Sequence, residues 1–306
     1  MARLRIATRG SALAVAQSSL VARAIERALG VETELVRIKT SGDRMPNVSL
    51  AGVGGKGLFV KELEEALLEG GADLAVHSAK DLPARLAPGL ALAALPERGD
   101  PRDALVGSTF EALRPGARVG TGSLRRGAQL RAARPDLAIE PLRGNVDTRL
   151  RKLAEEGLDA VVLACAGLDR LGLASHIAER LSPARLLPAV AQGTLALEAR
   201  EGTALAADLG ALDHAPTRAA TRAERAFLER LAGDCNVPLA AWARVEGERI
   251  ALDALLASPD GSKLLRAAES APLAEPEAAG RAAADAILAA GGDAVLAALA
   301  PGGARP

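Results

Sequence analysis

Residues 117–164 read ARVGTGSLRRGAQLRAARPDLAIEPLRGNVDTRLRKLAEEGLDAVVLA. This stretch alternates strand-like and helix-like segments: we predict strands over residues 117–120, 138–142 and 159–164, and helices over residues 123–133 and 146–156. Strands that alternate with helices usually lie parallel in one sheet, and the helices cover its faces. The stretch therefore predicts an α/β fold with parallel, doubly wound sheets.

The same alternation extends towards the N-terminus. We predict strands over residues 4–7, 34–39 and 72–77, helices over residues 11–29 and 58–69, and Gly30 as the cap that ends the first helix. Turn residues break the pattern at residues 99–101 (GDP) and again between residues 187 and 194. We expect the chain to cross between two α/β units at these places.

The chain changes character after Pro216. We predict a charged helix over residues 217–231, a loop over residues 233–238, a hairpin of strands 240–246 and 249–257 around Gly247, and a final alanine-rich helix. A chain of 306 residues exceeds what one hydrophobic core usually holds, so we expect two or three domains.

Composition argues against several classes of protein. The formal net charge is zero and the chain has no Tyr, one Trp and three Phe, which disfavours a nucleic-acid-binding protein. No apolar run follows the charged N-terminus, and uncharged stretches such as residues 10–22 are too short to span a bilayer. Two distant cysteines and histidines without ligand spacing suggest neither a disulfide framework nor a metal site. We expect a cytoplasmic protein without a membrane partner.

Basic residues follow nearly every predicted strand. In chain order, the polar residues at the strand ends are Thr8, Arg9, Ser11, Ser78, Lys80, Asp81, Thr121, Ser123, Arg125, Arg126, Arg143, Asn145, Arg149 and Arg170. Open parallel sheets bind ligands beyond the carboxyl ends of their strands, and arginine binds carboxylates through two parallel hydrogen bonds. The pattern predicts a cleft for a polyanion or polycarboxylate. For any single arginine, a solvated surface position is the alternative.

Asp81 differs in sign from its neighbours. Lys80 and Arg9 would keep this carboxylate ionised, and an ionised carboxylate in a shielded cleft can stabilise a cation that forms during a reaction. A structural ion pair or a helix cap is the alternative role for Asp81.

The two cysteines lie in different surroundings. Cys235 lies in a polar turn, where a thiol can serve as a nucleophile or a covalent tether, although an unreactive loop thiol is the alternative. Cys165 ends an apolar strand, so we expect it to be core packing.

Two further features suggest no separate function. Residues 52–57 match GxGxxG but do not directly follow a strand, so we reject a dinucleotide site and predict a flap over residues 41–57. His77 ends a predicted strand, where a hydrogen-bonded core histidine is the simplest expectation.

Nine stretches in this order resemble the porphobilinogen deaminase (hydroxymethylbilane synthase) family along almost the whole chain. They are RIATRGS (5–11), VGGKGLFVKE (53–62), HSAKD (77–81), GDPRDA (99–104), GTGSLRR (120–126), RGNVDTRL (143–150), AGLDRL (166–171), LPAVAQG (187–193) and GDCNVP (233–238). The resemblance implies a transferase of tetrapyrrole (haem) biosynthesis that acts as a monomer. It condenses four porphobilinogen molecules head to tail into hydroxymethylbilane and releases ammonia at each addition.

The resemblance also implies three domains. The first two are doubly wound α/β domains, similar to periplasmic binding proteins, around a cleft, and the third is a small α+β domain. The implied bounds are residues 1–97 plus 194–213, residues 98–193, and residues 216–306.

The resemblance assigns roles to residues. Asp81, Lys80 and Arg9 are expected to be catalytic, and a dipyrromethane cofactor is expected to be attached through a thioether to Cys235. The residues expected to bind the cofactor besides Cys235 are Ser78, Lys80, Asp81, Thr121, Ser123, Arg125, Arg126, Arg143, Gly144, Arg149 and Arg170. The residues expected to bind substrate are Arg9, Ser11, Lys56, Phe59, Arg143, Asn145, Arg149, Arg170 and Gln192.

Three positions depart from the pattern of the family. Gly122 replaces a serine, Ala79 replaces a larger residue, and Asp234 replaces a glycine. A cytoplasmic anion or solute receptor with the same two-lobed architecture is the alternative function, but such a receptor needs neither Asp81 nor Cys235.

Overall fold

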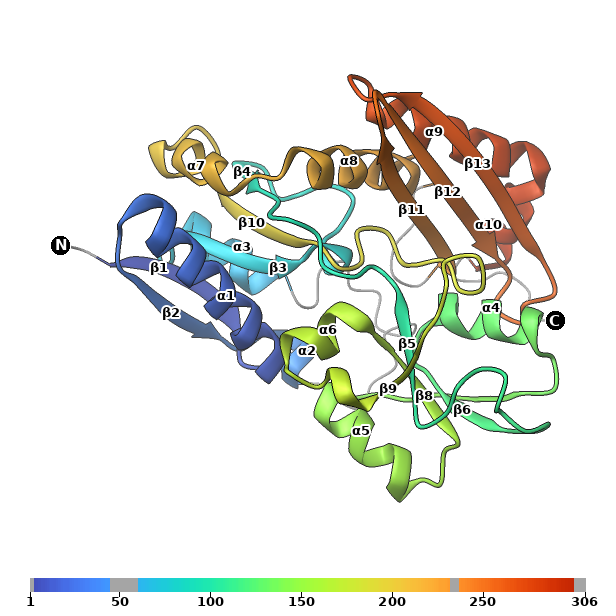
Figure 1. Cartoon of the computed structure of the whole chain (residues 1–306). Coiled ribbons are helices and arrows are strands. Elements are labelled where there is room, and N and C mark those ends of the chain that lie inside the picture. The colour runs from blue at the N-terminus through green and yellow to red at the C-terminus, as the bar shows by residue number, and fades with distance from the viewer. Residues whose placement is uncertain (1–2, 45–59, 232–236, 300–306) are drawn as a thin grey trace.

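Three sheets organise the part of the chain that the computed structural model describes, which is residues 3–44, 60–231 and 237–299. Two five-stranded sheets have the orders β2-β1-β3-β10-β4 and β7-β6-β8-β5-β9, and a three-stranded sheet has the order β11-β12-β13. Figure 1 shows the two larger sheets in separate lobes, with the third sheet beside them. The predicted fold class, two α/β units followed by a small α+β unit, is confirmed.

The first sheet begins with the predicted strand–helix–strand unit. Its elements are β1 (Leu4–Arg9), α1 (Ala12–Leu29), β2 (Thr33–Ile38), α2 (Ser41–Arg44), α3 (Lys61–Leu68), β3 (Leu74–Ser78), the 3₁₀ helix η1 (Ala79–Asp81), β4 (Leu90–Ala94) and β10 (Leu195–Arg200). Ser11 caps α1 by accepting a hydrogen bond from the Ala14 N–H, and Gly30 ends the helix with a φ of 67°, as predicted. Val21 and Ile25 of α1 pack against Ile6 in the core of this unit.

The second sheet repeats the scheme. Its elements are β5 (Asp103–Val106), β6 (Arg118–Gly120), α4 (Leu124–Ala133), β7 (Ala138–Glu140), α5 (Val146–Glu155), β8 (Ala160–Ala164), α6 (Cys165–Arg170), the 3₁₀ helix η2 (Ala174–His176) and β9 (Ile177–Arg180). Cys165 is fully buried, packs with Leu163 and Leu168, and is core, as predicted.

The expectation of purely parallel sheets is wrong. β10 runs antiparallel to β3 and β4, and β5 runs antiparallel to β8 and β9, so each sheet holds one reversed strand. Both reversed strands directly follow a crossing of the chain from the other sheet. A strand that enters a sheet from the other unit lacks the helical crossover that returns the chain to the parallel direction.

The two crossing segments lie side by side. The N–H of Gly99 donates to the carbonyl of Gly193 at 3.1 Å. Gly193 has a φ of 90°, and a Cβ atom there would lie 2.5 Å from the Gly99 oxygen. Only glycine accommodates this combination of backbone conformation and close approach.

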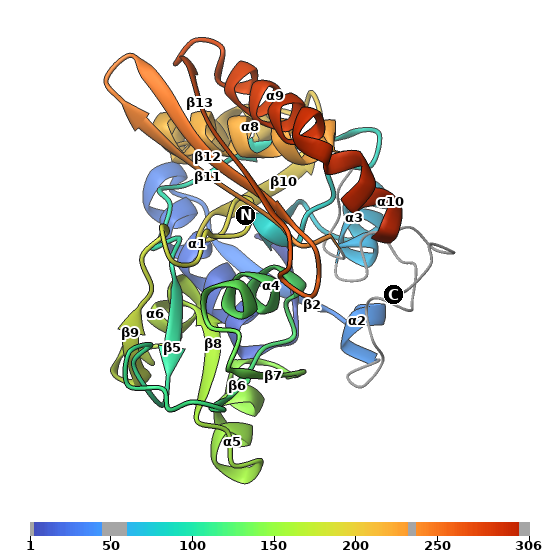
Figure 2. The ribbon, with the colours of Figure 1, turned by 90° about the vertical axis from the view of Figure 1, so that its right-hand side faces the viewer.

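The C-terminal part forms a separate three-stranded sheet. After α7 (Ala204–Asp208) and the 3₁₀ helix η3 (Leu209–Leu212) come α8 (Ala215–Arg230), β11 (Leu239–Glu246), β12 (Arg249–Ala257), β13 (Leu264–Pro272), α9 (Pro276–Ile287), the π-helical turn η4 (Leu288–Gly292) and α10 (Asp293–Leu299). The predicted hairpin is confirmed as β11 and β12, whereas β13 was not predicted. Figure 2 shows α9 lying along this sheet.

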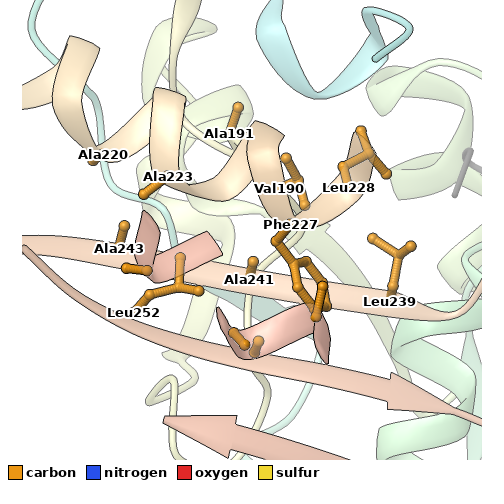
Figure 3. Packing of buried hydrophobic residues seen from close by; sticks show 14 of the residues in the cluster. Val190, Ala191, Ala220, Ala223, Phe227, Leu228, Leu239, Ala241, Ala243 and Leu252 are labelled. Atoms are coloured by element: carbon orange, nitrogen blue, oxygen red, sulfur yellow. The ribbon is translucent and has the colours of Figure 1, made fainter. Parts of the chain in front are cut away.

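Helices α8 and α9 pack tightly on one face of this sheet. Phe227 and Ala223 of α8 lie over Ala241 and Ala243 of β11 (Figure 3). At Gly280 of α9 an added Cβ atom would lie 2.1 Å from a backbone oxygen of α8, so the two helices cross with almost no space between their backbones.

The segment Pro276–Leu299 is long and apolar enough to cross a membrane by length and composition alone. It is not one straight helix, because Gly291 has a φ of 96° and kinks it. Ala283 and Ile287 of α9 are fully buried in the core that contains Phe227. One face of this segment is therefore used for packing within the protein.

Candidate active site

The carboxyl ends of β1 and β3 bring four predicted residues together. The two strands are parallel neighbours, so the residues that follow them reach the same edge of the sheet. Arg9, Ser11, Ser78 and Asp81 line one hollow of about 60 Å³. The Gln17 amide, which also lines the hollow, donates to the Ser78 hydroxyl at 3.1 Å.

His77 lines the same hollow and is hydrogen-bonded to a buried carboxylate. Its side chain is almost fully buried, and Nε2 lies 2.9 Å from the carboxylate of Glu198 on β10, itself fully buried. The prediction of a hydrogen-bonded core histidine is confirmed.

Lys80 lies close to charged residues of the second unit, among them Asp103 and Arg126. Its Nζ donates to Gln192 Oε1 at 3.3 Å, and Gln192 Nε2 donates to the carboxylate of Asp103 at 3.0 Å. Burial and the nearby Arg126 guanidinium lower the pKa of Lys80 to about 8, although Asp81 and Asp103 oppose this change. Gln192 connects Lys80 with Asp103 in this structure, and its expected contact with substrate stays a prediction.

Asp103 is the buried anion of the site. One carboxylate oxygen accepts a hydrogen bond from Arg125 at 2.8 Å, and the other accepts two from Arg126 at 2.7 and 2.9 Å. All three side chains are buried. Burial raises the pKa of Asp103, but the two guanidinium groups outweigh it and hold that pKa far below its usual range.

The partners of Arg125 and Arg126 differ from those that the sequence suggests. The sequence suggested that both face ligand carboxylates, whereas the structure places both on Asp103. Their contribution to cofactor binding stays a prediction. Asp103 itself was overlooked: it stands in the quoted GDPRDA stretch, and a lone acid followed by an apolar run was the only signal for it.

Arg149 points into the site from α5. Its Nε donates to the Gly144 carbonyl at 2.8 Å, and Gly144 has a φ of 114°. Burial, together with Arg126 and Arg143, lowers the pKa of Arg149 to about 10, while Asp81 acts in the opposite direction. Asp81 of the first unit is therefore close enough to act electrostatically on Arg149 of the second unit.

Two hydroxyl groups and one amide lie at the helix starts of the second unit. Ser123 caps α4 by accepting a hydrogen bond from the Arg126 N–H, and the Thr121 hydroxyl accepts one from the Ser123 N–H. Asn145 has the backbone conformation of a cap for α5, but its side chain makes no capping hydrogen bond. These positions put polar side chains at the edge where Arg149 lies.

Arg170 lies at the crossing segments. Its guanidinium donates to the Gly193 carbonyl at 2.5 Å, and burial lowers the pKa of Arg170 to about 10. Arg170 thus contacts the backbone that joins the two units, which residue type and strand-end position alone did not suggest.

The departures from the family pattern have structural consequences. A Cβ atom at Gly122 would lie 2.5 Å from the Leu142 oxygen, so the expected serine would require the backbone to shift. Ala79 is buried and packs in the cluster that contains Phe227 of α8. Lys56, Phe59, Asp234 and Cys235 lie outside the described residues, as does most of the predicted flap.

The described residues fit a polycarboxylate cofactor. Burial is the main cause that lowers the pKa of Lys80 and of Arg149, and neighbouring arginines act in the same direction. Carboxylates bound there would relieve the repulsion between these cations. A dipyrromethane group brings such carboxylates.

Two family models match the chain. Residues 4–208 match "Porphobilinogen deaminase, dipyromethane cofactor binding domain", and residues 219–289 match "Porphobilinogen deaminase, C-terminal domain". These matches cover most of the chain and include the residues that surround Asp81.

Curated relatives carry the same name. A porphobilinogen deaminase of Syntrophotalea carbinolica is 54% identical over 301 residues, which are 97% of this chain and 96% of that protein. One of Sorangium cellulosum is 54% identical over 269 residues (86% and 90%), and one of Xanthomonas campestris is 52% identical over 292 residues (94% and 96%).

Solved structures with partial similarity include a periplasmic substrate-binding protein of an ABC transporter from Coxiella burnetii. It is 13% identical, with a TM-score of 0.43 over 72% of this chain and 96% of that chain.

The family matches favour an enzyme over the solute receptor that was the alternative. The enzyme is a transferase with a dipyrromethane cofactor. From two family models and relatives that are half identical over nearly the whole length, we conclude that the chain belongs to the porphobilinogen deaminase family.

Proposed function

We propose that the chain carries out the reaction of its family, the head-to-tail condensation of four porphobilinogens into hydroxymethylbilane, through the residues around Asp81. The observation that supports this assignment is the position of Asp81. Its exposed carboxylate lines the hollow with Arg9 and Ser11, and it acts on Lys80 and Arg149.

In this proposal Asp81 is the charge partner of the reacting pyrrole. Loss of ammonia from porphobilinogen leaves an electron-poor cation, and a carboxylate that is already positioned beside the reacting atoms stabilises this positive charge. In the same proposal, Lys80 and Arg9 contact the acidic groups of the substrate.

The cations of the second unit hold carboxylates in this proposal. Each pyrrole brings an acetate and a propionate, so a growing chain needs several guanidinium groups. Arg143, Arg149 and Arg170 are assigned this role, with Ser78, Thr121, Ser123 and Asn145 as hydrogen-bonding partners. Arg125 and Arg126 contribute from the buried cluster with Asp103.

Cys235 is proposed to hold the dipyrromethane group through a thioether. When bound, that group supplies an anchored pyrrole end to which new units are added. We propose Lys56, Phe59 and Gln192 as further substrate contacts, and Gln192 would act through Lys80.

We further propose the three domains at the bounds that the resemblance implies. The pairing of β10 with β3 and β4 supports the return of the chain to the first domain near residue 194. The cytoplasm and the monomeric state are proposed from the resemblance.

Intact mass and peptide mapping test the proposal. The purified chain should be heavier than its sequence by one dipyrromethane, and the added mass should map to the peptide of Cys235. An active enzyme without added mass, or with the adduct on Cys165, would overturn the proposed attachment.

A further inference from the structure

A second, larger cavity lies between β4, α8 and α9. Its volume is about 330 Å³, which is in the range of small-molecule sites. One part of its wall is apolar, from Ala84, Leu92, Leu95 and Ala226. The remainder holds five arginines, Arg218, Arg222, Arg225, Arg230 and Arg281, and two glutamates, Glu229 and Glu277. None of these residues belongs to the site around Asp81.

The arginines of this cavity use only part of their hydrogen-bonding capacity. Arg225 donates through one nitrogen to the carbonyls of Pro83 and Ala84 at 2.9 and 2.7 Å, and burial lowers the pKa of Arg225. Arg222 donates through Nε to Glu277 at 2.5 Å. A guanidinium has five N–H donors, so donors remain on both side chains. Among the described residues no hydrogen bond or ion pair engages Arg281.

Thr221 adds an independent observation. Its side chain is 1% exposed, it lines the cavity, and its hydroxyl has no hydrogen-bond partner among the described residues. A buried hydroxyl without a partner costs free energy, and such groups are rare in folded proteins. A ligand in the cavity that accepts a hydrogen bond would satisfy it.

We propose that this cavity binds a small organic carboxylate with an apolar body. The arginines supply charge-assisted donors for the acidic groups, the Thr221 hydroxyl supplies a neutral donor, and Leu92 and Leu95 cover the apolar body. An inorganic anion would leave the apolar wall unused. Arg225 connects the cavity to Pro83 and Ala84, in the segment that follows Asp81.

Phthalate is a suitable probe, and inorganic phosphate is the matched inorganic anion. Isothermal titration of the cofactor-loaded enzyme should show one phthalate bound per chain and clearly weaker binding of phosphate. Arg281→Ala should weaken phthalate binding about tenfold or more, since hydrogen bonds to charged groups are among the strong ones. Arg266→Ala is the control, because Arg266 is also exposed but lies on β13 outside the cavity.

Thr221→Val should change stability and phthalate binding in opposite directions. Valine has a similar shape without the unpartnered hydroxyl, so the free variant should melt roughly 1–4 °C above the wild type. The same variant should bind phthalate more weakly. A residue with a purely structural role would not combine a gain in stability with a loss in binding.

Three outcomes would overturn the proposal. They are the absence of phthalate binding to the wild type, equal affinity for phosphate and phthalate, and unchanged phthalate affinity in Arg281→Ala. The last would place the phthalate elsewhere, for example at the cations around Asp81. The binding measurement does not depend on turnover, so its failure is distinct from a failure of the proposed catalytic roles.

Discussion

Asp103 is the buried acid that supports the cations of the active site, and Asp103→Asn tests that support. Its carboxylate is fully buried and accepts three hydrogen bonds from two arginines at 2.7 to 2.9 Å. Asparagine removes the charge and turns one acceptor into an NH₂ group that faces a guanidinium. Because two buried cations would then lack their anion, we expect a loss of about 3–5 kcal/mol in the free energy of unfolding.

Urea denaturation of the cofactor-loaded enzyme, followed by circular dichroism, measures this loss. Asp136→Asn is the matched control, because Asp136 also accepts two hydrogen bonds from one arginine, Arg134, at 2.7 Å each. That pair is exposed to solvent, and exposed ion pairs contribute little to stability. If Asp103→Asn unfolded at the same urea concentration as Asp136→Asn, the supporting role of Asp103 would be refuted.

The pH dependence of stability gives a second readout for Asp103. Burial raises its pKa, but Arg125 and Arg126 outweigh burial, so the folded pKa lies far below the unfolded value of about 4. A group with a lowered folded pKa stabilises the protein above its unfolded pKa, and this stabilisation is lost as the pH falls through the folded pKa. The wild type should therefore lose stability below about pH 4 more steeply than Asp103→Asn does.

Four further outcomes are expected. Asp81→Asn should keep the melting temperature but lower the turnover number by about 10²–10³-fold, and near-normal formation of hydroxymethylbilane would contradict its role. Arg149→Ala should stall elongation, seen by mass spectrometry as accumulated enzyme with partial pyrrole chains, whereas Arg266→Ala should give the wild-type distribution of intermediates. Cys235→Ser should be inactive, lack the added mass and melt at a lower temperature, because a ligand that binds only the folded state stabilises it, whereas Cys165→Ala should keep the cofactor. Turnover should fall as the pH rises through the pKa of Lys80, which is about 8 without bound carboxylates and higher with them, and Lys80→Arg should remove this fall because arginine stays charged.

Residues within or next to an element were sufficient to predict much of the secondary structure. Helix α1 ends at Gly30, as the sequence predicts, and the structure shows that Ser11 caps its start. The hairpin of β11 and β12 turns at Gly247, where the sequence predicts it, and Gly247 has a φ of 63°. In these elements the residues that determine the conformation lie within the element or next to it.

The reversed strands could not be predicted in the same way. All four residues of β5 are buried, and so are five of the six residues of β10, so neither has the alternation that marks a half-exposed strand. Their direction depends on where the chain enters the sheet after a crossing. That information is spread over distant segments and is absent from the strand itself.

The site also contains residues that the sequence predicts and residues that it does not. Arg9, Ser78 and Asp81 were found because the ends of parallel strands meet at one edge, which is a property of the fold class. Asp103 and Gln192 lie at the crossing segments, and the hydrogen bond between them joins residues 89 positions apart. No spacing rule connects such residues, so the buried partners of Lys80 and Arg126 became visible only in the structure.

The ion pairs with Asp103 divide the basic residues of the site into two groups. Arg125 and Arg126 have their charge compensated by Asp103, so a bound polycarboxylate gains less from them. Burial lowers the pKa of Lys80 to about 8 and that of Arg149 to about 10, and neighbouring arginines act in the same direction. Asp81 opposes both changes, and Asp103 opposes the one at Lys80. Binding of carboxylates beside these two residues would raise their pKa values towards the usual range and lower the free energy of the folded protein. We therefore expect a polycarboxylate bound at this site to stabilise the fold as well as to take part in the reaction.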